Sequence, residues 1–135
     1  MKEERALPDQ IAASSALLSA YLMTARLPYA MLSEELLQFA KRRWWDEDAG
    51  IFASLDIDED CLINCEAARL LCRLAALHRD EEYARAAVLA AGADYFGDAT
   101  RILSAFSPAQ IGRAALVGAY GLALDEQLRL RANLQ

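Results

Sequence analysis

The chain has 135 residues, of which 56% are hydrophobic and 25% are charged. This composition is typical of a single globular domain, residues 1–135, and excludes a disordered polar chain. The formal net charge of −6 makes this an acidic protein and disfavours nucleic acid as a partner, because phosphate backbones repel an acidic surface.

The sequence predicts a first helix from Asp9, as its N-terminal cap, to about Thr24, with residues 1–8 as a flexible end. This helix is apolar on nearly every side, so it needs cover from several neighbours. The first ten residues lack the apolar core of a secretory signal peptide. The longest apolar runs, 11–23 and 114–124, are shorter than the roughly 20 residues that span a membrane. We therefore expect a cytoplasmic protein with no membrane contact.

A second helix is predicted to start at Pro28 or at Ser33 and to end at the basic run 41–43. Cations at that end complement the helix dipole. The helical pattern then stops, because residues 44–50 are typical of a turn and residues 51–53 are long enough only for a short extended piece.

A third helix is predicted to begin near Asn64, and its apolar face consists of Ala67, Ala68, Leu70, Leu71, Leu74 and Leu77. The three cysteines, Cys61, Cys65 and Cys72, are an odd number in one short stretch, which disfavours a disulfide framework. We expect buried thiols rather than a metal cluster completed by His78, the single histidine. We expect His78 to lie on the surface at the end of this helix, where it would cap the C-terminus.

Asp80 is predicted to cap a fourth helix, on which Glu81 and Arg85 have the i,i+4 spacing of a supporting ion pair. Residues 107–110, Ser-Pro-Ala-Gln, form a capping box that predicts a fifth helix, and residues 125–135 are expected to be its charged helical tail. Together these elements predict an all-α fold of roughly five or six helices arranged in antiparallel αα-hairpins.

Four stretches carry a family resemblance: 9–10, DQ; 16–21, ALLSAY; 45–52, WDEDAGIF; and 64–83, NCEAARLLCRLAALHRDEEY. They resemble the helical region of thioredoxin-domain-containing proteins of the spermatogenesis-associated type. That region is similar to the α/α toroids of N-acylglucosamine 2-epimerases and six-hairpin glycosidases. The resemblance is partial, since this chain has no counterpart of the thioredoxin domain. It implies a partial α/α toroid or a helical bundle and, as an alternative function, a remnant of a carbohydrate-active enzyme.

A chain with too few hairpins to close a toroid leaves the apolar faces of its inner helices uncovered, and exposed apolar faces mark interfaces. We therefore expect a two-fold homodimer, or association with another protein. The corresponding enzymatic alternative is a half-toroid whose site is completed across the dimer. A small-ligand binding protein, with a pocket between hairpins, is a third alternative.

Acidic residues near the predicted hairpin ends are the candidates for catalysis: Asp46, Asp48, Asp58 and Asp60. Glycoside hydrolysis needs two carboxyl groups about 5–9 Å apart, whereas a carboxylate at a helix end ordinarily serves as a cap or a solubilising charge. Residues 56–60 match the start of an EF-hand calcium loop, but Cys61 stands where its sharp turn needs glycine. We expect a solvated acidic loop here, no bound metal and no cofactor.

Aromatic residues near the hairpin ends are the candidates for a surface that binds a ligand or a partner: Tyr29, Trp44, Trp45 and Phe52. Packing at the hairpin ends explains the same residues. Weighed together, these features favour a non-enzymatic helical module that acts through self-association or protein–protein interaction.

Overall fold

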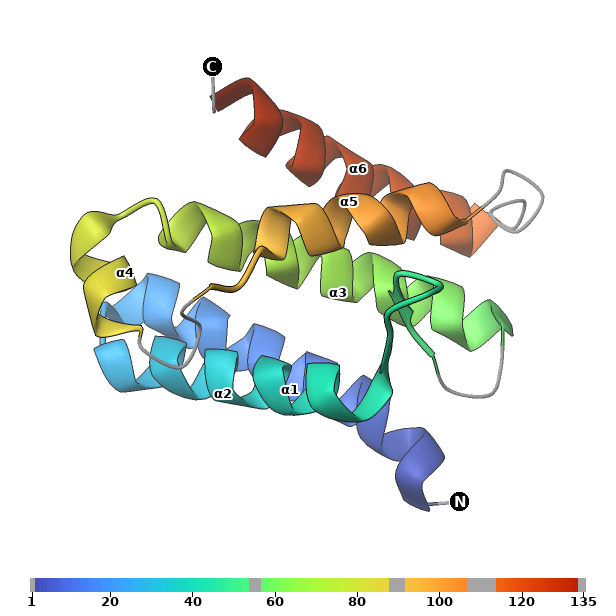
Figure 1. The fold of residues 1–135 in the computed structure, drawn as a ribbon, viewed down its shortest axis with the longest axis horizontal. Helices are drawn as coiled ribbons and strands as arrows, with labels where there is room; N and C mark the ends of the chain where they lie inside the picture. The colour runs from blue at the N-terminus through green and yellow to red at the C-terminus, as the bar shows by residue number, and fades with distance from the viewer. Residues whose placement is uncertain (1, 54–56, 88–91, 107–113, 134–135) are drawn as a thin grey trace.

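The computed structural model describes residues 2–53, 57–87, 92–106 and 114–133. These ranges contain six helices and one two-stranded sheet: α1 (Lys2–Thr24), α2 (Leu27–Trp44), β1 (Trp45–Asp46), β2 (Ile51–Phe52), α3 (Ile57–Leu77), α4 (Glu81–Ala86), α5 (Tyr95–Ala105) and α6 (Ala114–Asn133). Figure 1 shows α3 in the middle, with the α1–α2 hairpin on one side of it and α5 and α6 on the other. The predicted all-α fold is confirmed.

Serine hydroxyls hold the two helices of the α1–α2 hairpin together. Ser14 and Ser33 are both fully buried, and each donates a hydrogen bond of 2.7 Å to the backbone carbonyl of the other. Such small side chains allow the helix backbones to approach closely. Ala25 directly follows the last residue of α1 and has a φ of 58°, which terminates that helix. Pro28 lies in the first turn of α2, where its missing N–H needs no partner. Of the two predicted starts, the one at Pro28 is confirmed.

Helix α1 begins at Lys2, so the prediction that Asp9 caps it is wrong. Pro8 lies inside this helix and removes one backbone N–H from the hydrogen-bond ladder. Core packing offsets that loss, because Leu7 is 0% exposed and Ile11 is 1% exposed. Tertiary burial, rather than a local capping signal, therefore extends the helix toward the N-terminus.

Among the described elements, helix α3 supplies the largest share of the core, and its residues contact α1, α5, α6 and β2. The predicted apolar face is confirmed, since five of its members are fully buried: Ala67, Ala68, Leu70, Leu71 and Leu74. The expectation of core cysteines is also confirmed, because none of the three forms a disulfide and each is at most 4% exposed. Burial raises the pKa of the Cys65 thiol to about 12 and that of the Cys72 thiol to about 11.

Helix α3 starts at Ile57, about two turns before the predicted start near Asn64. The expected acidic loop at residues 56–60 is therefore wrong for residues 57–60, which are helical. The first turns of α3 pack into the molecule, with Cys61 at 1% and Asp60 at 8% exposure. This burial favours helix in a segment that local sequence alone leaves undecided.

Asn64 fastens the small sheet to α3. Its Oδ1 accepts a hydrogen bond of 2.8 Å from the Phe52 N–H, and its Nδ2 donates to the carbonyls of Phe52 and Asp60, both at 2.7 Å. Strand β2 pairs antiparallel with β1, so the short extended piece predicted at residues 51–53 is confirmed and has a partner at Trp45–Asp46. Asn64 is fully buried, and both its amide oxygen and its amide nitrogen have hydrogen-bond partners, which fixes β2 against α3.

Helices α4 to α6 complete the fold. The predicted cap of α4 is confirmed, since the Asp80 side chain accepts from the N–H groups of Glu82 and Tyr83. Helix α5 has no counterpart among the predicted helices; Asp94 caps it by accepting from the Gly97 N–H at 3.0 Å. The predicted capping box at residues 107–110 lies outside the described residues, whereas residues 125–133 are helical as expected. No helix in the described ranges is long and apolar enough to cross a membrane.

Candidate functional site

A buried carboxylate lies at the centre of the most densely connected polar group in the described structure. Glu34 is 2% exposed and lies on the inner face of α2, together with Ala30, Ser33, Leu37 and Ala40. Charged side chains are almost never buried unless partnered. Glu34 therefore requires partners from the surrounding helices.

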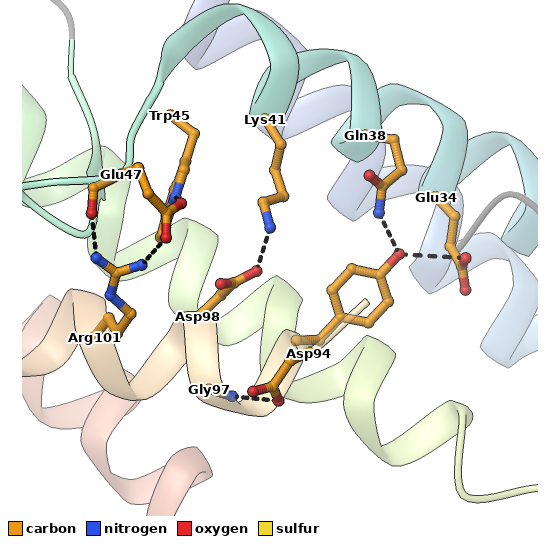
Figure 2. A network of polar contacts seen from close by, with 10 residues as sticks. Glu34, Gln38, Lys41, Trp45, Glu47, Asp94, Gly97, Asp98 and Arg101 are labelled. Carbon is orange, nitrogen blue, oxygen red and sulfur yellow. Dashed lines mark hydrogen bonds and ion pairs between the residues drawn. The ribbon is translucent and has the colours of Figure 1, made fainter. Parts of the chain in front are cut away.

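Two helices, α4 and α5, and the turn after α3 supply those partners. The Glu34 Oε1 atom accepts a hydrogen bond of 2.8 Å from the Tyr83 hydroxyl of α4 and contacts Nε2 of His78, in the turn that follows α3. Its Oε2 atom accepts from the Tyr95 hydroxyl of α5 at 3.4 Å. We refer to Glu34, His78, Tyr83 and Tyr95 as the Glu34 cluster. In Figure 2, Glu34 and the neighbouring Gln38 extend from α2 toward α5.

Ring contacts keep the Glu34 cluster rigid. The His78 imidazole meets the ring of Tyr83 edge-on, with centroids 5.2 Å apart, and that of Tyr95 at 5.4 Å. Gln38 Nε2 donates to the Tyr95 hydroxyl at 2.9 Å, so this phenol oxygen has both a donor and an acceptor. The side chains are thus fixed by packing as well as by hydrogen bonds.

Burial and the carboxylate together determine the protonation of the two phenols. Loss of solvent, and then the hydrogen bond to Glu34, raise the pKa of Tyr83 far above its ordinary value. Burial likewise raises the pKa of Tyr95, and the charge of Glu34 adds to the effect. Both tyrosines therefore remain neutral donors throughout the physiological range. With three protein groups around a carboxylate that is 2% exposed, this arrangement joins α2, α4, α5 and the turn after α3 rather than presenting a base to a substrate.

A second polar group joins the β1–β2 turn and α2 to α5 closer to the surface (Figure 2). Arg101 Nη1 lies 2.7 Å from Glu47 Oε1, and Lys41 Nζ lies 2.5 Å from Asp98 Oδ2. The Trp45 indole N–H donates to Glu47 Oε2 at 2.8 Å. This hydrogen bond, followed by the interactions with Arg101, lowers the pKa of Glu47. We refer to Lys41–Asp98 and Glu47–Arg101 as the outer ion pairs.

The predicted catalytic carboxylates have separate structural settings. Asp46 accepts hydrogen bonds from the N–H groups of Asp48 (3.0 Å) and Ala49 (3.1 Å), which closes the turn between the strands. Asp48 is exposed on that turn, and Asp60 is buried in α3. The side chain of Asp58 lies outside the described part of the structure. Asp46 thus closes a turn between two strands and does not cap a helix. The helical course of residues 57–67 rules out an EF-hand loop there.

The predicted aromatic surface is divided into three separate places. The Trp45 and Phe52 rings pack edge to face across the sheet with centroids 5.0 Å apart, and Phe52 is 0% exposed, so it belongs to the core. Trp44 packs instead on Phe39 of α2, at 6.2 Å. Tyr29 lies in the first turn of α2, at the opposite end of that helix. The structure brings together only Trp45 and Phe52.

The Glu34 cluster is absent from the sequence-based candidates, and His78 is not the surface residue that the sequence predicts. Its imidazole packs between two tyrosines and contacts a glutamate 44 positions away. One signal for Glu34 is present in the sequence: it occurs in phase with the stripe of small and apolar residues on the inner face of α2. Among the described residues, no group of three or more His, Cys, Asp and Glu side chains is arranged to hold a metal ion.

No protein-family model matches this chain, and neither a characterised protein nor a solved structure matches it significantly. The resemblance to the helical region of the thioredoxin-domain-containing proteins therefore remains a prediction that rests on the residues quoted for it.

Proposed function

We propose that this protein is a helical association module that pairs with a second copy of itself through the outer side of α6. One observation carries the proposal: the first part of α6 is apolar in sequence, and its described stretch, residues 117–124, is covered on one side only. From Ala114 to Leu124 this helix contains no charged residue. A helix of this kind is ordinarily buried all round.

The exposed fractions distinguish the two sides of α6. On the inner side, Ala123 is 0% and Leu130 is 7% exposed, in contact with the core formed by α3 and α5. On the outer side, Val117 is 53%, Leu122 is 54% and Leu128 is 49% exposed. Figure 1 shows α6 at the edge of the molecule, beyond α3 and α5. Covering these large apolar side chains would release a favourable hydrophobic free energy.

Two glycines make the same side of α6 accessible to another helix. Gly118 and Gly121 are exposed, and a Cβ atom added at either would have no contacting atom within 4 Å. Against the described residues the glycines therefore serve no close packing, although they weaken the helix. A partner helix could approach the backbone closely at these positions, as at small-residue contacts between helices.

The charges on α6 favour a second copy as the partner. The protein carries a net charge of −6, so two copies repel each other except where the contact is neutral. The outer side of α6 carries one exposed acid and one exposed base, Asp125 and Arg129, which pair at 3.0 Å. A surface with one charge of each sign can face its own copy across a two-fold axis with opposite charges matched.

Sedimentation velocity over a range of micromolar concentrations tests this proposal. We expect a monomer–dimer equilibrium for the unchanged chain and a monomer for Leu122→Glu, because a buried, unpaired carboxylate opposes the contact. Met23→Glu is the matched control: Met23 is 87% exposed at the end of α1, and its substitution should leave the dimer intact. A monomer at every concentration, or equal losses for both variants, would contradict the proposal.

A further inference from the structure

A cavity of about 320 Å³ lies between α4 and the connection from α1 to α2. In Figure 1, α4 lies against this end of the α1–α2 hairpin. The lining combines two aromatic rings, Tyr21 and Tyr83, with two carboxylates, Asp80 and Glu82, and with the apolar side chains of Ala25 and Leu27. The cavity is separate from the outer side of α6 and has the volume of a site for one small molecule.

The aromatic wall has the character that attracts a cation. The rings of Tyr21 and Tyr83 are tilted by 50°, and their centroids lie 6.1 Å apart. Tyr83 donates its hydroxyl proton to the buried carboxylate of Glu34 at 2.8 Å, which polarises the phenol and enriches its ring in electron density. Cations are attracted to the negative face of such rings.

The charges around the cavity act in the same direction. Asp80 and Glu82 are both exposed acids, and Asp80 is held in place because its Oδ1 accepts from the N–H groups of Glu82 and Tyr83. None of the described residues that line the cavity is basic. Two neighbouring cations are engaged elsewhere, since Arg79 donates to the Leu130 carbonyl at 2.9 Å and Arg85 pairs with Glu81 at 3.5 Å. Arg26, between Ala25 and Leu27, is exposed and is not part of the lining.

From this combination we infer that the cavity binds a small organic ammonium ion, with its alkyl groups against the ring of Tyr21, which Tyr83 backs from the core, and its charge facing Asp80 and Glu82. A metal ion would gain nothing from the apolar and aromatic part of the lining. An anion would be repelled by both carboxylates. A neutral apolar molecule would leave the two acids without a counter-charge. The ammonium ion is the class of ligand that uses every part of the wall.

Calorimetric titration with choline and with its neutral isostere 3,3-dimethylbutan-1-ol tests the inference on the full chain. We expect choline to bind and the isostere to bind at least roughly tenfold more weakly, because the two probes share shape and differ in charge. Equal binding of both probes would show that the cavity recognises apolar shape and not charge, which would overturn the inference. Absence of binding by either probe would also overturn it.

Two matched pairs of variants locate the site. Tyr21→Phe keeps a ring face and should bind choline nearly as well as the unchanged chain, whereas Tyr21→Leu should lose roughly three- to tenfold in affinity. Glu82→Gln should weaken choline binding, whereas Glu81→Gln should not, since Glu81 belongs to the same helix but does not line the cavity. Equal effects within either pair would overturn the inference. Circular dichroism verifies that each variant is folded.

Discussion

Helix α5 is joined to α2 and to the β1–β2 turn by two polar contacts that differ mainly in burial. At one end, Glu34 is 2% exposed and receives hydrogen bonds from tyrosines of α4 and α5. At the other end, the Glu47 and Arg101 side chains of the outer ion pairs are 79% and 40% exposed, although they lie only 2.7 Å apart. Contact distance alone would rank the two ends as equal.

The difference teaches that solvent determines how much each contact matters. Water competes for the exposed Glu47–Arg101 pair and screens it, so this pair contributes little to stability. Water is excluded from the Glu34 cluster, so a missing partner there leaves a buried polar group unsatisfied. Figure 2 draws the two sets of contacts alike, but removing a side chain from the Glu34 cluster should cost more folding stability than removing one from an outer ion pair.

The largest effect is expected from Glu34→Ala. This change removes the shared acceptor of Tyr83 and Tyr95 and the partner of His78, and it leaves a space in the core, so the free energy of unfolding should fall by about 3 kcal/mol. Denaturant titration measures the loss. The exposed neighbour Glu35 provides the control, and Glu35→Ala should change stability very little. If Glu34→Ala does not fold, Glu34→Gln, which keeps one acceptor oxygen, should show an intermediate loss of stability. Equal stabilities for the Glu34 and Glu35 variants would refute the claim that burial makes Glu34 more important.

An intermediate effect is expected at alkaline pH. The raised pKa of Tyr83 and Tyr95 means that the folded protein keeps phenol protons which the unfolded chain releases above a pKa of about 10. This contribution is fully present below pH 10 and is lost as pH rises beyond it, by up to about 1.4 kcal/mol per pH unit for each phenol. Thermal unfolding from neutral to alkaline pH measures the slope. Tyr83→Phe should reduce the dependence of stability on alkaline pH, and it should also lower stability near neutral pH. An unchanged slope would exclude Tyr83 as a cause of the alkaline loss of stability.

The smallest effect is expected from Arg101→Ala, which removes one of the outer ion pairs. Because both partners are accessible to water, the free energy of unfolding should fall by less than about 1 kcal/mol, and added salt should reduce the difference further. Denaturant titration at low and high salt measures both values. Arg85→Ala, which removes the exposed pair with Glu81 on α4, is the control and should behave similarly. A loss as large as that of Glu34→Ala would mean that the β1–β2 turn depends on Arg101 for its position.

Local signals in the sequence determined the helical class and several boundaries of this protein. The Asp80 cap, the proline at the start of α2 and the apolar face of α3 all act through groups a few residues apart, so they can be read from the chain directly. The break after Trp44 and the short extended piece follow from the same kind of signal.

Only the tertiary structure decided how far some helices extend and which polar groups meet. The early starts of α1 and α3 depend on burial of Leu7 and Cys61, which no local cap announces. Glu34 and His78 are 44 positions apart and become partners only because α2 and α3 pack against the same neighbours. Helix propensity and capping are properties of adjacent residues, whereas the partner of a buried charge depends on the fold that excludes water from it.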